Sequence, residues 1–241
     1  MSDAIKFPKT PRLAEVSRQD VQRAWRHHTA VVEEKVDGAN VGVWFDGSEL
    51  RLQSRGHVLR GGSGERQFAP LHAWAAERHE ALFEVLGPNR VLYGEWCFAK
   101  NKSYYDRLPD WFIGYDVLER LSGTFLPTPQ RDDVLLMAQV HRVPRLWTGT
   151  FGKAPAFMSL IGPSRLKSPR WREALTREAA RVGVRDPMKE TDDSDAMEGV
   201  YVRVEDTEGV VARIKLHREG YEKVRNDSWR EAPLIRNTRQ A

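Results

Sequence analysis

Hydrophobic positions along the chain gather in short runs that are rich in β-branched and aromatic residues. Such runs, when polar or glycine-containing segments bound them, are typical of β-strands. The pattern predicts strands over residues 31–35, 41–45, 50–54, 91–98, 111–118, 199–204 and 210–216. Asp46-Gly47 lies between the second and third runs and predicts a hairpin turn, because Asp-Gly tolerates the positive φ angles of tight hairpins.

Other segments carry apolar residues at helical spacing. The predicted helices span residues 21–28, 71–86, 131–140 and 169–182. Gly87 is a stop for the second helix, and Ser168-Pro169 is a favourable start for the last. Strands outnumber helices and mostly follow one another as hairpins, so we expect an α+β fold with largely antiparallel sheets flanked by helices. Without a repeat or a linker, the chain is predicted to form a single domain over residues 1–241.

Composition places the chain among globular proteins. It has 241 residues, and 38 Lys and Arg against 34 Asp and Glu give a net charge of +4. No apolar run approaches the roughly 18 residues of a membrane span, and residues 1–12 lack the apolar core of a signal peptide. A single cysteine, Cys97, excludes an internal disulfide framework and a Cys-based zinc site. We therefore expect a soluble, cytoplasmic protein with no membrane partner.

The positive charge is concentrated near the C-terminus. From residue 213 onward, eight Lys and Arg stand against four Asp and Glu, and this net charge of +4 equals that of the whole chain. Clustered cations suit contacts with nucleic-acid phosphates. A solvated basic helix has the same composition, so charge alone leaves both interpretations open.

The segment Lys35-Val36-Asp37-Gly38 joins two predicted strands. A lysine at such a turn can act as an amine nucleophile when its surroundings lower its pKa. Gly38 would let the backbone pass close to a ligand. Taken alone, the segment is equally typical of a charged hairpin turn that contains Asp-Gly.

Further segments with unusual polar residues follow in order and weaken this simpler interpretation. They are Ser54-Arg55-Gly56, Gly94-Glu95-Trp96, the aromatic run 111–116, Glu198-Gly199-Val200 and Arg213-Ile214-Lys215. Glu95 lies inside an apolar strand, where an unpaired charge would be costly. Arg213 and Lys215 lie two residues apart and therefore on one face of a strand.

This ordered set, from about residue 33 to residue 218, resembles the covalent nucleotidyltransferases: ATP-dependent RNA and DNA ligases and mRNA capping enzymes. Asn40, just after the lysine motif, resembles the RNA ligase branch that is similar to T4 RNA ligase 2. The resemblance implies the adenylation fold of ligases, which is similar to ATP-grasp. It also implies that Lys35 attacks the α-phosphate of ATP and carries AMP as a phosphoramidate.

The resemblance implies roles for further residues. Lys215 would neutralise charge on the α-phosphate, and a hydrated metal together with Lys215 would lower the pKa of Lys35. Arg55 would contact ribose or phosphate, and Tyr115 would stack on adenine with Asp116 behind it. Glu33 or Glu34 would accept from the adenine amino group. The remaining ATP contacts would come from Gly38, Asn40, Glu95, Glu198, Arg213 and His217.

Asp37, Glu95 and Glu198 would gather around Mg²⁺ or Mn²⁺, held partly through water, because converging carboxylates repel one another without a cation. The family's last basic motif is usually Lys-x-Lys. Here it is either Arg213-x-Lys215 or Lys215-x-His217, and Lys215 belongs to both registers. We expect the catalytic residues to be Lys35, Asp37, Glu95, Glu198 and Lys215.

The resemblance implies an ATP-dependent RNA ligase that seals 5′-phosphate and 3′-hydroxyl RNA ends, in RNA repair alongside an end-healing kinase or phosphatase. With 34 residues before Lys35 and 26 after Lys215, we expect no accessory OB or C-terminal domain, which disfavours a capping enzyme. RNA would then be gripped by the basic C-terminal segment and the loop over residues 55–66. Two alternatives remain: an ATP-dependent DNA nick ligase, and a nucleic-acid-binding protein that keeps the fold without adenylyl transfer.

Overall fold

The computed structural model describes residues 4–16, 18–221 and 233–240. Its larger sheet has the strand order β3-β2-β4-β5-β6, and β7 pairs with β5 in parallel. These strands are β2 (Ala39–Asp46), β3 (Glu49–Ser54), β4 (Arg90–Trp96), β5 (Phe112–Glu119), β6 (Thr124–Phe125) and β7 (His141–Arg142). All other pairs in this sheet are antiparallel, and the β2–β3 hairpin turns at Gly47, whose φ is +61°.

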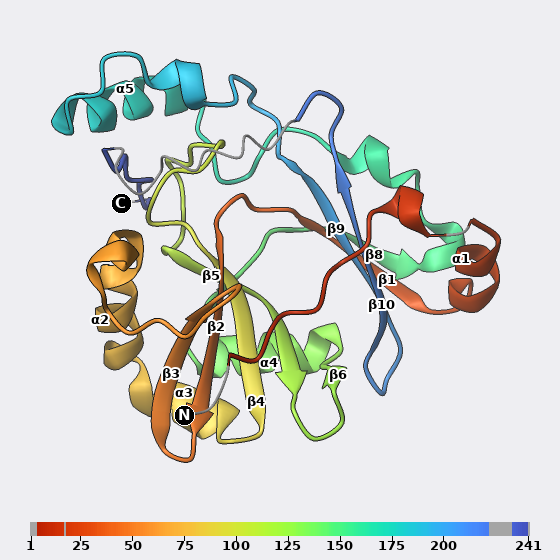
Figure 1. The fold of residues 1–241 in the computed structure, drawn as a ribbon. Helices are drawn as coiled ribbons and strands as arrows, with labels where there is room; N and C mark the ends of the chain where they lie inside the picture. The colour runs from red at the N-terminus through yellow and green to blue at the C-terminus, as the bar shows by residue number, and fades with distance from the viewer. Residues whose placement is uncertain (1–3, 17, 222–232, 241) are drawn as a thin grey trace.

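The smaller sheet is antiparallel throughout, with the order β10-β9-β1-β8. It consists of β1 (Thr29–Glu34), β8 (Arg145–Thr150), β9 (Gly199–Glu205) and β10 (Val210–His217). Central strand β1 is buried along almost its whole length because β8 and β9 flank it. Figure 1 shows this sheet beside the larger one. The C-terminal end of β1 and the N-terminal end of β9, which pair with each other, face the larger sheet.

Helices pack around the two sheets. They are α1 (Arg18–Trp25), α2 (Ala69–Glu77), α3 (His79–Leu86), α4 (Thr128–Met137) and α5 (Trp171–Arg181). Short 3₁₀ helices cover Leu13–Glu15, Ser63–Phe68, Phe151–Lys153, Phe157–Leu160 and Pro187–Glu190. The apolar faces of α2, α3 and α4 bury Leu71, Leu82 and Leu135 against Val43, Leu92 and other residues of the larger sheet. This packing forms the main core.

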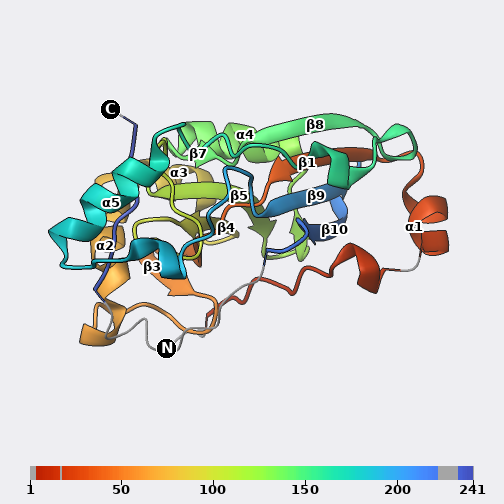
Figure 2. The same ribbon diagram turned by 90° about the horizontal axis from the view of Figure 1, so that it is seen from above.

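The N-terminal segment, residues 4–12, forms an extended arm instead of a helix or strand. In Figure 2 the arm runs along the side of the molecule opposite α4. Ile5 and Phe7 pack on a second apolar cluster that contains Tyr93, Tyr115 and Phe125. The arm thus crosses from the larger sheet toward the smaller one.

The α+β class and the antiparallel sheets agree with the sequence prediction. The single helix predicted over residues 71–86 is instead two helices, because Arg78 leaves the helical region (φ −110°, ψ 9°) between α2 and α3. Strand β8 was not predicted, since its sequence RLWTGT carries polar residues and a glycine at an edge that is half exposed. Within the described residues, no helix is both long and apolar enough to cross a membrane.

Candidate active site

A cavity of about 360 Å³ lies where the two sheets and the N-terminal arm meet. The larger sheet contributes Asn40, Glu95, Tyr115 and, just past β3, Arg55. The smaller sheet contributes Glu34, Tyr201, Lys215, His217 and, just past β1, Lys35. Five Lys and Arg side chains (Lys9, Arg12, Lys35, Arg55 and Lys215) line the cavity against two carboxylates, Glu34 and Glu95. The wall thus carries a positive charge that suits an anionic ligand.

Lys35 is positioned by the pairing of β1 with β9. Its backbone N–H donates to the carbonyl of Gly199, at 3.0 Å, directly beyond the last strand pair. A Cβ at Gly199 would lie 1.9 Å from the carbonyl oxygen of Leu216, so only glycine allows β9 and β10 to approach this closely. Glu198 immediately precedes this glycine, which brings its carboxylate beside the lysine.

The ammonium of Lys35 lies 2.9 Å from Oε1 of Glu198, and Nε2 of His217 lies 3.1 Å from the same oxygen. Glu198 is fully buried, and the Lys35 side chain is 16% exposed. Burial alone lowers the pKa of Lys35, but the carboxylates of Glu198 and Glu95 outweigh it and raise the pKa above its ordinary value of 10.5. In the protein alone the pKa of Lys35 is therefore raised, whereas the sequence predicted that it would be lowered.

Strand β10 divides its basic residues between two environments. Lys215 and His217 line the cavity. The guanidinium of Arg213 lies instead over the rings of Phe125 and Phe7, with centroid distances of 3.9 and 4.6 Å, and 3.5 Å from the carboxylate of Asp116. Of the two registers that the sequence left open, Lys215-x-His217 is the one that faces the cavity.

The opposite wall comes from the larger sheet. Asn40 on β2 pairs with Glu95 on β4, and its side-chain amide donates to the hydroxyl of Tyr115 on β5. Burial raises the pKa of Tyr115 well above its ordinary value, so the phenol stays neutral. Asp116 lies behind Tyr115, where it accepts hydrogen bonds from Arg203 and Tyr201. The Tyr115 side chain itself is held by Asn40 at its hydroxyl and by the neighbouring rings of Phe7 and Tyr201.

Glu33 and Glu34 are both buried, but they point to opposite sides of β1. Glu33 forms a bidentate ion pair with Arg131 of α4, with N–O distances of 2.7 and 3.0 Å, and it does not line the cavity. Glu34 lines the cavity and accepts hydrogen bonds from the Ser164 hydroxyl and the Arg165 backbone N–H. Of the two alternatives for an adenine contact, the structure brings only Glu34 to the cavity.

Asp37 and Gly38 lie outside the cavity lining. Oδ2 of Asp37 accepts hydrogen bonds from the Ser103 backbone N–H and the Tyr221 hydroxyl, both at 2.9 Å, and so holds two loops together. A Cβ at Gly38 would lie 2.9 Å from Sγ of Cys97, so this glycine permits a close approach to the end of β4. The expectation that Gly38 passes close to a ligand stays a prediction.

Among the described residues, no group of three or more His, Cys, Asp or Glu side chains is arranged to hold a metal ion. The expected cluster of Asp37, Glu95 and Glu198 is thus not a ready-made set of direct ligands, because hydrogen bonds commit Asp37 elsewhere. Glu95 and Glu198 both act electrostatically on Lys35. A hydrated Mg²⁺ or Mn²⁺ fits this pair, since such ions keep several waters and use one or two carboxylates together with substrate phosphates.

Sequence reasoning missed the residues that the N-terminal arm brings to the cavity: Phe7, Pro8, Lys9, Thr10 and Arg12. It also missed Tyr201 on β9. The spacing of Lys6, Lys9 and Arg12, three residues apart around Pro8 and Pro11, was a signal for an extended basic segment. Of the predicted RNA-gripping cations, Lys223, Arg225 and Arg230 lie outside the described residues.

Comparison with known proteins agrees with this geometry. The RNA ligase family matches residues 28–217, which include the lysine motif and the cavity residues of both sheets. The chain belongs to the RNA ligase family. A search among curated proteins found no match. The assignment to the T4 RNA ligase 2-like branch stays a prediction.

Solved structures of Naegleria gruberi RNA ligase share the fold. A mutant with ATP and Mn matches with a TM-score of 0.62 at 16% identity, over 90% of this chain and 57% of that one. The same enzyme with PPi gives a TM-score of 0.60 at 16% identity, and another mutant with AMP and Mn gives 0.60 at 15%; each match again covers 90% of this chain and 57% of that one. The present chain therefore spans little more than half the length of the Naegleria gruberi chains that it matches.

Proposed function

We propose that this RNA ligase family member is an ATP-dependent RNA ligase whose nucleophile is Lys35. The observation that carries the proposal is the position of the Lys35 ammonium, 2.9 Å from buried Glu198, in a cavity lined mainly by cations. A lysine that serves only as a structural ion pair does not need a cavity with a surplus of positive charge. A nucleotide needs both the charge and the aromatic wall.

In the first step, the neutral amine of Lys35 attacks the α-phosphorus of ATP. The N–P bond forms, the bond between the α-phosphorus and its bridging oxygen to the β-phosphate breaks, and pyrophosphate leaves with the bond's electron pair. Oε1 of Glu198 is within hydrogen-bond reach of Nζ and can accept the proton that Lys35 gives up, while His217 contacts the same oxygen. Lys215 offsets the charge that builds on the α-phosphate.

The remaining cavity residues bind and orient the nucleotide. The neutral ring of Tyr115 is the surface on which adenine stacks, and the Glu34 carboxylate accepts from the adenine amino group. Arg55 donates to ribose or phosphate through its planar fork. Glu95 and Glu198 would hold a divalent cation, which would supply positive charge beside the phosphates.

AMP then passes from Lys35 to the 5′-phosphate of an RNA end, and the 3′-hydroxyl of a second end displaces it as the strands join. An RNA repair role follows from these end groups, because a kinase and a phosphatase are the activities that produce them from broken RNA. A DNA nick ligase is the second candidate within the same chemistry. Matched nicks that differ only in an RNA or DNA 3′-hydroxyl strand separate the two.

The first experiment is incubation with ATP labelled at the α-phosphate and with Mg²⁺ or Mn²⁺, followed by a denaturing gel. We expect the native chain to retain label, Lys35→Ala to lose it, and Lys153→Ala to keep it, since Lys153 is exposed and lies outside the cavity lining. The label should be released by acid and survive alkali, as a phosphoramidate does. Absence of label with both metals, and with GTP in parallel, would overturn the proposal and favour a role limited to nucleic-acid binding.

A further inference from the structure

The N-terminal arm is fastened to both sheets. At one end, Ile5 exchanges two hydrogen bonds with the side chain of Gln53 on β3, at 2.8 and 2.7 Å, and its carbonyl also accepts from the Tyr93 hydroxyl. At the other end, the backbone N–H of Lys215 on β10 donates to the carbonyl of Pro11 at 3.0 Å. The arm is therefore a fixed bridge across the gap between the sheets, and part of the cavity wall.

Phe7 anchors the middle of this bridge. Its ring makes edge contacts with Tyr93, Tyr115 and Phe125, at centroid distances of 4.9 to 5.6 Å. Arg213 covers the same ring. These contacts fix the path of the arm next to Tyr115, so the residues that follow Phe7 have a defined place in the cavity.

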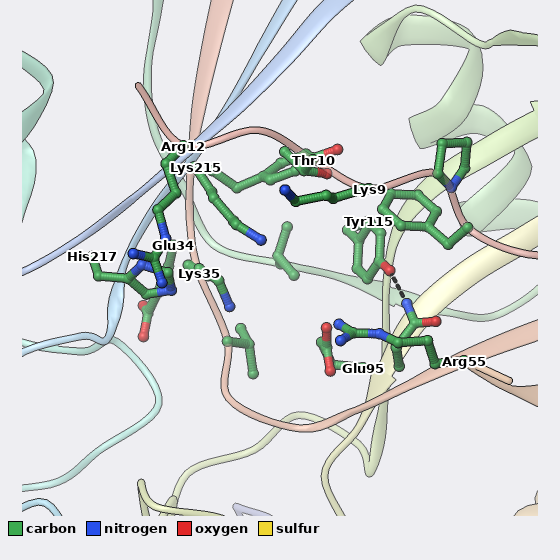
Figure 3. Close-up of a pocket in the computed structure, with 16 residues that line it drawn as sticks. Lys9, Thr10, Arg12, Glu34, Lys35, Arg55, Glu95, Tyr115, Lys215 and His217 are labelled. Atoms are coloured by element: carbon green, nitrogen blue, oxygen red, sulfur yellow. Dashed lines mark hydrogen bonds between the residues drawn. The ribbon is translucent and has the colours of Figure 1, made fainter. Parts of the chain in front are cut away.

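Lys9 and Arg12 follow directly on the arm and line the cavity together with Lys215. Figure 3 shows them on the side of the hollow where the arm crosses, with the Arg12 side chain reaching toward His217. The Lys9 side chain is 82% exposed, and its ion pair with Glu15 is long, at 3.8 Å. An exposed pair of this kind contributes little and is readily exchanged for a stronger anion.

The depth of the cavity orders the phosphates of a bound nucleotide. Lys35 lies deep, with 16% of its side chain exposed, whereas Lys9 lies at the mouth. In phosphoryl transfer the attacking and leaving atoms are roughly in line with the phosphorus. If Lys35 attacks from the interior, the leaving pyrophosphate must lie on the outer side, which is where the arm crosses.

We propose that Lys9 and Arg12 bind the β- and γ-phosphates of ATP and hold the pyrophosphate leaving group. The inference rests on the proposed use of ATP and adds a triphosphate subsite built by the arm. The cations of the cavity then have separate roles, because Lys215 serves the α-phosphate while Lys9 and Arg12 serve the two phosphates that leave.

The decisive measurement is binding without catalysis. In the Lys35→Ala chain, which has no nucleophile, the dissociation constants of ATP and AMP are measured by calorimetry before and after adding Lys9→Ala and Arg12→Ala together. We expect ATP to bind about tenfold more weakly while AMP is unchanged, because only ATP carries the two outer phosphates. Raising the salt concentration should shrink this difference. Lys6→Ala is the matched control, since Lys6 is an exposed cation of the same arm outside the cavity lining.

Equal weakening of ATP and AMP would overturn the proposal and make the arm a purely structural bridge, and unchanged ATP binding would overturn it as well. A second measurement uses inorganic pyrophosphate, which should remove the label from the native chain by re-forming ATP from lysyl-AMP, and about tenfold higher concentration should be needed with the double variant. Loss of AMP transfer to RNA with normal pyrophosphate release would assign the arm to the RNA 5′-phosphate instead. ATP-selective binding in a chain that never becomes labelled would support the subsite and overturn only the ligase function.

Discussion

Two clusters of buried charge lie at different positions on the smaller sheet, where Arg203 of one cluster and Lys215 of the other share a face, and the clusters do different work with the same residue types. In the first, the structural cluster, Glu33 pairs with Arg131, and Arg203 lies between Asp116 and Glu205. In the second, the cavity cluster, Lys35 and His217 meet at Glu198, with Lys215 nearby.

The structural cluster is enclosed. Its two arginines, Arg131 and Arg203, are fully buried among three buried carboxylates, and backbone carbonyls such as that of Tyr115 accept further N–H groups. The cavity around the second cluster has more cations than carboxylates in its wall and is open at the arm. A charge that is enclosed and paired is costly to leave without its partner, whereas a surplus of one sign facing a cavity provides a binding site for the opposite sign.

The largest expected effect comes from breaking the structural cluster. Arg131→Met leaves Glu33 buried without its partner, which should lower the free energy of unfolding by about 3 to 5 kcal/mol. Urea denaturation measures the loss. Adding Glu33→Leu removes the stranded carboxylate and should restore most of the stability. Labelling by ATP per folded molecule should stay near the native level, and a loss of label in folded Arg131→Met would show that this cluster takes part in nucleotide binding.

The next effect separates two cations of β10. Lys215→Ala should slow labelling by ATP about a hundredfold or more, because it removes a charge placed at the reacting phosphate. Arg213→Ala should slow labelling far less and act mainly on stability, by about 1 kcal/mol, since its guanidinium packs on Phe7 and Phe125. Single-turnover labelling rates decide between them. Equal slowing by both substitutions would mean that the Arg213-x-Lys215 register is the functional one.

The smallest expected effect is a change in the pH dependence of stability, and it concerns Glu34, whose carboxyl is buried at the cavity. Burial raises its pKa above the ordinary value of 4.5, although Ser164 and Arg165 oppose the shift. A carboxyl with a raised folded pKa contributes stability below about pH 4.5 and loses it as the pH rises through the folded pKa. Glu34→Gln keeps the hydrogen-bond acceptor without the charge. It should therefore gain stability relative to the native chain as the pH rises from 4.5 to 7.5.

Denaturation curves at the two pH values test this directly. Parallel pH dependence of the native chain and Glu34→Gln would mean that Glu34 is as well solvated as a surface glutamate. The matched variant Glu33→Gln should lose stability at both pH values, because it weakens the charged pair with Arg131.

Local pattern was enough to predict most of the fold. Strands β2, β4 and β9 carry dense apolar and β-branched runs, and each lies within two residues of its predicted bounds. The pattern failed where neighbours supply the stabilisation. Strand β8 is stabilised by its pairing with the edge of β1 that β9 does not occupy. At the helix break, the Arg78 side chain contacts Trp74 and Asp110.

The candidate site divides in the same way. The order of the motifs predicted that Lys35, Glu198 and Lys215 belong together. The adjacent strands β1, β9 and β10 bring Lys35 and Lys215 to one cavity wall, with Glu198 buried beside Lys35. The motifs could not show that Asp37 is committed to Ser103 and Tyr221, because one of these partners lies 66 residues away in the chain and the other 184.

The sequence by itself determined the class of fold, the order of the strands' apolar runs and the residues that are chemically able to serve a nucleotide. It also determined that Glu33 and Glu34 face opposite ways, since side chains alternate along a strand. Only the tertiary structure decided which of these two glutamates lines the cavity. It also decided that His217, and not Arg213, lines the cavity together with Lys215, and that the arm supplies Lys9 and Arg12. Alternation places side chains on the two faces of a strand, but the elements that pack around each position decide whether a charge is enclosed in an ion pair or remains open to a ligand.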